Sequence, residues 1–90
     1  MNKWKIKFTS KAEKNLGKLS VNVQVYIADY LYNQVLSLDH PKLFGKALKH
    51  NKKGCWRYRV NKYRIVCRIQ DEVLTILVLQ IAKRDVVYED

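Results

Sequence analysis

The N-terminal segment alternates strictly between polar and apolar residues. In residues 3–8, "KWKIKF", Trp4, Ile6 and Phe8 alternate with lysines. A period of two residues is typical of a strand that buries one face and exposes the other. We therefore expect a strand here, with its aromatic and aliphatic side chains facing a core.

A short helix is predicted directly after this strand. Ser10 and Glu13 have the spacing of a capping box, which indicates a helix that begins at Ser10. Ala12, Leu16 and Leu19 would then share one face of that helix. This face needs a partner surface that buries it.

A longer helix is predicted from Ser20, a favourable N-cap residue, to Asp39. Its apolar residues recur every three or four positions, at Val23, Ile27, Leu31, Val35 and Leu38. Pro41 ends the pattern, because the residue before a proline disfavours the α conformation. We interpret the tyrosines of this helix as packing residues. The basic, irregular segment 42–53 indicates a loop or a single turn.

Three more strands are predicted in the C-terminal half. Residues 56–60 and 63–69 each alternate between apolar and basic or polar side chains. Asn61 and Lys62 join them as a two-residue turn, which predicts a hairpin. Residues 73–82, "VLTILVLQIA", are apolar on both faces, as is typical of a strand in the interior of a sheet.

These elements predict an α+β fold in one small domain that spans residues 1–90. Their order is strand, helix, helix, strand, strand, strand, with an antiparallel-rich sheet. Both helices should cover one face of the sheet, because their apolar stripes have no other surface to pack on. The other face should be open and basic.

Positive charge is the unusual feature of the composition. The formal net charge is +10, and the segment from His40 to Gln70 holds ten lysines and arginines with no acidic residue. A basic surface of this kind indicates a polyanionic partner, most often a nucleic acid. An acidic protein or an anionic membrane surface is an alternative. No stretch resembles a membrane span or a signal peptide, so we expect a cytoplasmic protein.

The cysteines and histidines do not predict a metal site. Cys55, Cys67, His40 and His50 fit no common ligand spacing, so we expect no metal and no cofactor. The predicted hairpin register sends the side chains of Cys55 and Cys67 to opposite faces of the sheet. A disulfide between them is therefore not expected.

The hairpin is predicted to gather arginines on one face. A two-residue turn places Arg59 opposite Arg64 and Arg57 opposite Val66. Like charges in opposite positions destabilise a sheet by about 0.2–1 kcal/mol. An ordinary solvated face is one interpretation, but such a face normally mixes both signs of charge. Arginine alone suits a phosphate, which the guanidinium group binds with two hydrogen bonds.

The chain resembles the RelE/ParE superfamily of bacterial toxins from toxin–antitoxin pairs. The resemblance lies in the order of elements and in the segments "CWRYRV", "KYRIVCRI" and "LQIAKRDVVY". Its RelE branch implies a metal-independent endoribonuclease that cleaves mRNA in the ribosomal A site by attack of the 2′-OH on the adjacent phosphate. The resemblance also implies a cognate antitoxin, the ribosome and mRNA as partners.

Six catalytic residues are implied by this resemblance: Arg57, Arg59, Arg64, Lys83, Arg84 and Tyr88. The arginines would bind the phosphate and stabilise the transition state, and Tyr88 would stack on a base or orient it. Arginine does not readily release a proton, so Lys83 and Tyr88 are the candidates for proton transfer. Ribosomal RNA contacts are predicted for Lys42, Lys46, Lys49, Lys52, Lys53, Lys62 and Arg68.

Two other functions remain open at this point. The ParE branch of the same superfamily implies a non-enzymatic inhibitor of DNA gyrase, in which the arginine and tyrosine set is expected to be incomplete. A non-catalytic RNA-binding domain is the third possibility, because the sequence offers no obvious general base.

Overall fold

The computed structural model describes residues 4–35, 45–48 and 54–83. The helical elements are α1 (Ser10–Gly17), α2 (Val21–Asp29), the π-helix η1 (Tyr30–Val35) and the 3-10 turn η4 (Asp71–Val73). The strands are β1 (Lys5–Phe8), β2 (Lys46–Ala47), β3 (Cys55–Val60), β4 (Tyr63–Gln70) and β5 (Thr75–Lys83). Within these residues, no helix is long and apolar enough to cross a membrane.

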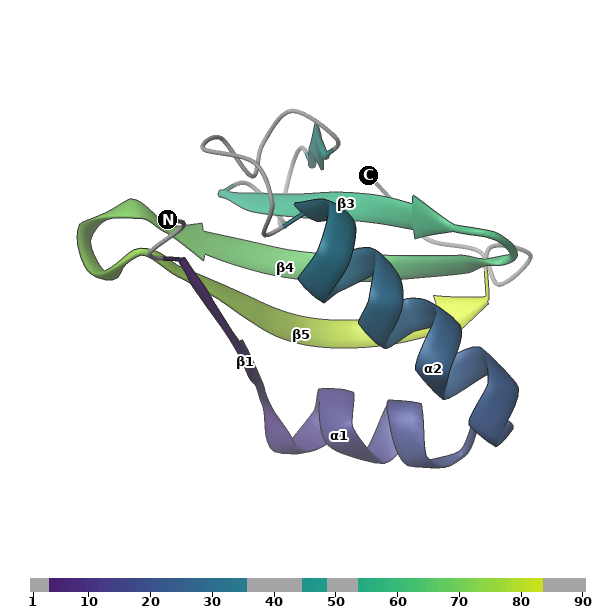
Figure 1. Ribbon diagram of the computed structural model, residues 1–90. Coiled ribbons are helices and arrows are strands. Elements are labelled where there is room, and N and C mark those ends of the chain that lie inside the picture. The colour runs from purple at the N-terminus through teal and green to yellow at the C-terminus, as the bar shows by residue number, and fades with distance from the viewer. Residues whose placement is uncertain (1–3, 36–44, 49–53, 84–90) are drawn as a thin grey trace.

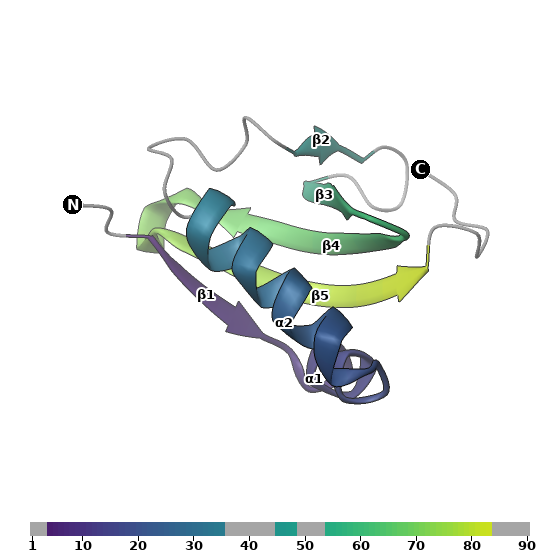
Figure 2. The ribbon, with the colours of Figure 1, turned by 45° about the vertical axis from the view of Figure 1, so that its right-hand side comes forward.

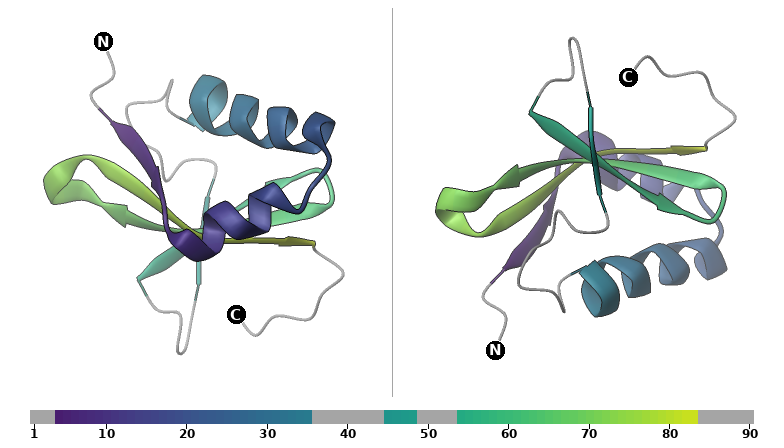
Figure 3. Two further views of the ribbon diagram at one scale, coloured as in Figure 1. Left: turned by 90° about the horizontal axis from the view of Figure 1, so that it is seen from below. Right: turned by 90° about the horizontal axis from the view of Figure 1, so that it is seen from above.

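All five strands form one sheet in the order β1-β5-β4-β3-β2 (Figure 1). β1 pairs parallel with β5, and the other neighbours pair antiparallel. α2 crosses the sheet on one side, as the two views in Figure 3 show. The predicted α+β class and the predicted order of elements are confirmed, with one additional strand.

The additional strand is β2, which lies in the segment predicted as a loop or a turn. Lys46 pairs with Arg57 and Ala47 pairs with Trp56, so β2 forms the edge of the sheet beside β3 (Figure 2). Two residues are too few for an alternating pattern to appear in the sequence, which is why the strand was not predicted.

The N-cap of α1 is Thr9, so the prediction that Ser10 caps this helix is wrong. The Thr9 hydroxyl accepts a hydrogen bond from the Ala12 N–H at 3.1 Å and donates one to the Leu79 carbonyl at 3.1 Å. The second bond ties the start of the helix to β5. Ser20 caps α2 as predicted, because its hydroxyl accepts from the Val23 N–H.

The second helix departs from the regular α-helix predicted from Ser20 to Asp39. α2 ends at Asp29, and the chain continues as the wider π-helix η1. Ile27, Leu31 and Val35 are all fully buried, and their four-residue spacing suits a widened turn. Residues 36–39 of the prediction lie outside the described part of the chain.

The main core lies between the helices and one face of the sheet. Its fully buried members include Tyr58, Ile65, Cys67, Ile76 and Val78 from the strands, joined by Ala12 of α1 and Ile27 of α2. Trp4 packs against this core, as predicted from its position in the alternating N-terminal segment. The two helices therefore share one core, as their apolar stripes require.

A smaller apolar cluster lies on the opposite face of the sheet. Leu48, Cys55 and Val66 are buried there, and Leu79 packs against them. Cys55 and Cys67 are free thiols in different clusters, as the predicted register requires. The face opposite the helices is thus partly apolar rather than wholly basic.

The predicted hairpin register is confirmed in every pair that was stated. Arg59 lies opposite Arg64, and Arg57 lies opposite Val66. Asn61 opens the turn with φ at 56°, in the left-handed region that asparagine tolerates. A bulge in β5 follows, since Val66 pairs with Gln80 while the next residue of β4 pairs with Val78.

Candidate functional site

We define the arginine face as the side of the sheet that carries Arg57 and Arg59 of β3 and Arg64 and Arg68 of β4. These positions alternate with Tyr58, Ile65 and Cys67, whose side chains lie in the main core. The five strands contain no aspartate or glutamate. The arginine face is therefore built from strands that supply positive charge and no carboxylate of their own.

The arginines differ in burial. Arg57 is only 5% exposed and Arg64 is half-buried, whereas Arg59 and Arg68 are exposed. The Nε atoms of Arg57 and Arg64 are both buried. A guanidinium group away from bulk water interacts more strongly with an anion, because the effective dielectric constant is lower. Arg57 and Arg64 therefore combine charge with a restrained position.

A cavity of about 230 Å³ lies beside Arg57 and Arg59. Lys46, Arg57, Arg59 and Tyr30 line it, so three cations and one phenol converge on it. Lys46 enters this group because β2 pairs with β3 at Arg57. Such a combination of donors is suited to a phosphate group.

Tyr30 is a member of this site that the sequence analysis assigned to helix packing. Its ring contacts Tyr58 edge to face, with centroids 6.2 Å apart, and it also packs against the main core. Burial raises the pKa of Tyr30 above its ordinary value, so its hydroxyl is protonated at neutral pH. Tyr30 can therefore donate a hydrogen bond, but it is not a proton acceptor in the manner of a general base.

Tyr58 is a second tyrosine near the site, but it belongs to the core. Burial raises the pKa of Tyr58 strongly, with smaller contributions from Cys67 and Tyr30. Its side chain is fully buried among core residues. Tyr58 supports the position of Tyr30 from within the core.

The remaining predicted catalytic residues lie at the end of β5 and beyond it. Lys83 is exposed and pairs with Tyr63, whereas the residue opposite Arg64 is Ala82. Lys83 therefore alternates onto the side of the sheet that Tyr63 faces, away from the Arg64 position. Arg84 and Tyr88 lie outside the described residues.

The three predicted RNA-contacting residues that the structure describes are not gathered in one place. Lys46 lines the arginine cavity, and Lys62 is exposed in the hairpin turn. Arg68 is four residues along β4 from Arg64, which is roughly 13 Å in a strand. The other four lie outside the described residues: Lys42, Lys49, Lys52 and Lys53.

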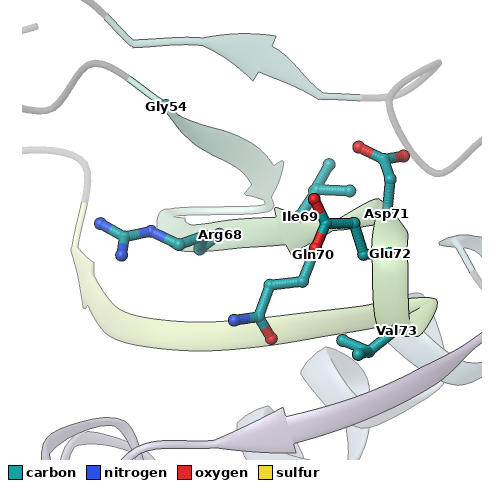
Figure 4. A pocket seen from close by; sticks show the side chains of 7 residues that line it. All are labelled: Gly54, Arg68, Ile69, Gln70, Asp71, Glu72 and Val73. Carbon is teal, nitrogen blue, oxygen red and sulfur yellow. The ribbon is translucent and has the colours of Figure 1, made fainter.

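Arg68 borders a different cavity, of about 520 Å³, at the other end of the hairpin. Asp71, Glu72 and Gly54 also line it (Figure 4). In the close-up, the Arg68 side chain points away from the two carboxylates. This cavity mixes both signs of charge, so it is less suited to a phosphate than the arginine cavity.

Metal ligation finds no support among the described residues, where no group of three or more histidine, cysteine, aspartate or glutamate side chains could hold an ion.

Comparison with known proteins shows the class of protein to which this fold belongs. A family model described as "ParE toxin of type II toxin-antitoxin system, parDE" matches residues 6–88. The chain therefore belongs to this family, within the RelE/ParE superfamily, and the resemblance seen in the sequence is confirmed.

Individual relatives agree with this assignment. The chain is 26% identical over 83 residues to the toxin RelG of Mycobacterium tuberculosis, covering 92% of this chain and 93% of the relative. It superposes on a chain of the M. tuberculosis toxin–antitoxin complex RelBE2 with a TM-score of 0.82 and 26% identity, covering 90% and 91% of the two chains. The isolated E. coli RelE toxin has the same fold, with a TM-score of 0.72 at 20% identity over 93% and 87%.

Proposed function

We propose that this toxin is a ribosome-dependent endoribonuclease that cleaves mRNA in the ribosomal A site. The observation that carries the proposal is the cavity where Arg57, Arg59 and Lys46 converge. A scissile phosphate placed there would meet donors that are already positioned, which is the main requirement for stabilising a pentavalent transition state.

The proposed reaction is a transesterification within the RNA. The ribose 2′-oxygen loses its proton and attacks the adjacent phosphorus, while the bond from phosphorus to the 5′-oxygen breaks. The leaving 5′-oxygen takes up a proton, and the products are a 2′,3′-cyclic phosphate and a 5′-hydroxyl. Arg57 and Arg64 would bind the charge that develops on the non-bridging oxygens.

Proton transfer is assigned in this proposal to residues at the C-terminal end. Tyr88 is the candidate for proton transfer, and Arg84 would stabilise the leaving oxygen. Lys83 is the weaker candidate, because it lies on the side of the sheet away from Arg64. The described arginines do not readily release a proton, and Tyr30 holds its own proton at neutral pH. The site as described supplies charge and orientation, so the ribosome would contribute alignment of the 2′-OH for in-line attack.

The partners proposed for the toxin follow from the same charge distribution. Lys46, Lys62 and Arg68, with the other four lysines of segment 42–53, would contact ribosomal RNA in the cytoplasm. An antitoxin with acidic side chains would neutralise the arginine face when bound. The similar M. tuberculosis and E. coli toxins are known from complexes with their antitoxins.

Cleavage in a reconstituted translation system tests the proposal. We expect primer extension to show cuts at codon-spaced positions in translated mRNA and none in the same mRNA without ribosomes. Arg64→Ala should reduce the cleavage rate about 10²–10³-fold, as loss of one positioned donor does in other enzymes. Lys5→Ala is the matched control, because Lys5 is an exposed cation on β1, at the far edge of the sheet. Intact mRNA under translation arrest would contradict the proposal.

Inhibition of DNA gyrase is the second candidate, because the matching family model carries the ParE name. In that case, expression of the toxin should produce gyrase-dependent DNA breaks while mRNA stays intact. The two outcomes can be read from the same culture by electrophoresis of DNA and primer extension of RNA.

A further inference from the structure

A second cavity adjoins the arginine cavity at the edge of β3. It has a volume of about 200 Å³ and lies between the end of α2, the start of η1 and the β3–β4 turn. Tyr30 and Arg59 line both cavities. The remaining polar and aromatic side chains of this second cavity are Tyr26, Asp29, Gln34 and Asn61. The two cavities therefore form one continuous surface around Arg59.

The π-helix η1 contributes two of the residues that line this second cavity. α2 runs across the sheet towards β3 and changes from α to π geometry at Tyr30 (Figure 1). Tyr30 and Gln34 are both in the widened segment, and both line the cavity. π-helical turns are rare and occur frequently at functional sites, because they displace side chains from regular positions. The edge-to-face contact with Tyr58 restrains the Tyr30 ring where it borders the cavity.

The lining combines the three kinds of group that bind a nucleotide. Arg59 is an exposed cation at the boundary with the arginine cavity. Tyr26 is an aromatic side chain with 53% of its surface exposed, which leaves a ring available for stacking. Gln34 and Asn61 carry amides, which can both donate and accept hydrogen bonds.

Asp29 adds a preference for hydrogen-bond donors. Its carboxylate can only accept hydrogen bonds when ionised. Asn33 donates one to Asp29 Oδ1 at 2.6 Å, which orients the carboxylate. A carboxylate repels a phosphate group. Asp29 is therefore suited to a part of the nucleotide next to the phosphate that carries N–H donors. The amino groups of cytosine, adenine and guanine are such donors, and uracil has no amino group.

We propose that this second cavity is a subsite for one nucleobase of the RNA whose backbone phosphate lies on Arg59. Tyr26 stacks on the base, and Asp29 accepts a hydrogen bond from its amino group. This inference extends the proposed RNA-cleaving function, and it gives the toxin a contact that distinguishes between bases. The described residues that line the arginine cavity are three cations and Tyr30, which suit a phosphate and do not distinguish between bases.

Binding of mononucleotides to the full-length toxin tests this subsite without requiring cleavage. In amide NMR spectra, cytidine 5′-monophosphate should shift the side-chain signals of Gln34 and Asn61 together with the backbone signal of Arg59. Inorganic phosphate should shift the Arg59 signal and leave the two side-chain amides in place. Identical patterns for both compounds, or no shifts at millimolar concentrations, would overturn the subsite.

Matched variants separate stacking from general effects on the helix. Tyr26→Ala should weaken binding of cytidine monophosphate about tenfold and leave binding of inorganic phosphate unchanged. Tyr32→Ala is the control, because Tyr32 is 48% exposed on η1 and lines neither cavity. Asp29→Asn should reduce the preference for cytidine over uridine monophosphate. Equal effects of Tyr26→Ala and Tyr32→Ala would contradict the stacking role.

The cleavage assay gives a second readout that distinguishes the two proposals. If the toxin cleaves mRNA, Tyr26→Ala should alter the distribution of cut codons, whereas Tyr32→Ala should not. Cleavage with an unaltered distribution would overturn the base subsite and leave the nuclease function standing. Mononucleotide binding at the subsite without any cleavage would overturn the nuclease function alone.

Discussion

The two faces of the sheet are built from the same strands, yet they differ in what their side chains do. On the helix side, Tyr58, Ile65 and Cys67 are fully buried in one continuous core. On the other side, the intervening positions hold Arg57 and Arg64, next to a small apolar cluster. Because neighbours in a strand point to opposite faces, the side chains that stabilise the core alternate with those proposed to bind RNA. Adjacent substitutions should therefore have different consequences.

The largest expected effect comes from removing both restrained arginines. Arg57→Ala combined with Arg64→Ala should lower the cleavage rate by about 10³-fold or more, which corresponds to about 4 kcal/mol in the activation free energy. The reason is that these two side chains would bind the charge of the transition state. The rate is measured by primer extension in a reconstituted translation system, with Lys5→Ala as the control.

Thermal unfolding of the same double variant shows whether the loss of cleavage comes from the site itself or from a less stable fold. A melting temperature close to that of the unchanged toxin supports a direct role for the arginines. A loss of cleavage that follows the unfolded fraction would instead assign the arginine face to stability and remove the difference between the faces.

The next largest effect should come from the helix side of the same strand. Ile65→Ala removes a fully buried side chain from the main core and should lower the free energy of unfolding by about 3 kcal/mol. Val66→Ala should lower the free energy of unfolding by less, because Val66, the next residue along β4, belongs to the smaller cluster. Urea denaturation measures both. Equal losses would show that the two clusters contribute equally.

A smaller effect is expected where α1 joins the sheet. Thr9→Ala removes both the N-cap bond to Ala12 and the bond to the Leu79 carbonyl, so it should cost about 1–2 kcal/mol. Ser10→Ala is the matched control, because Ser10 is exposed and is not the N-cap. Urea denaturation measures the free energy of unfolding of both variants. A larger loss of unfolding free energy in Ser10→Ala than in Thr9→Ala would instead support the capping box at Ser10 that the sequence predicts.

The sequence was sufficient to predict the hairpin and the division of the sheet into two faces. Strict alternation and a two-residue turn determine the pairing of Arg59 with Arg64, since a shift by one residue would expose the core residues. Thr9 and Ser10 are an example of a choice that the local sequence pattern does not determine. Both are good caps, and the choice depends on the Leu79 carbonyl, which is far away in the sequence.

Two features of the candidate site could not be predicted for the same reason. Arg57 and Arg59 are identical residue types in equivalent positions, but β2 pairs with Arg57 and Arg59 remains exposed. Tyr30 borders the arginines at the point where α2 passes into the π-helix η1, and a four-residue apolar spacing is compatible with both α and π geometry. Each feature depends on contacts between distant segments, which local patterns do not contain.

The smallest predicted effect tests whether the arginine face is destabilising in itself. Arg59 and Arg64 lie directly opposite each other, and like charges in such pairs cost about 0.2–1 kcal/mol. Arg59→Thr should therefore increase the free energy of unfolding by about 0.5 kcal/mol while it lowers cleavage. Threonine is a good strand residue, so the change removes charge without disturbing the backbone.

Arg68→Thr is the matched control for this gain. Arg68 is also an exposed arginine of the same face, but its partners are Cys55 and Leu77, which carry no like charge.

The gain from Arg59→Thr should decrease as salt is raised towards 1 M, because screening shortens the range of the repulsion. Urea denaturation at low and high salt measures both variants. A gain that is independent of salt, or equal in Arg68→Thr, would mean that strand propensity rather than charge sets the stability of this face. A gain confined to Arg59→Thr at low salt would show that the unbound toxin retains a repulsive pair, which a bound phosphate would relieve.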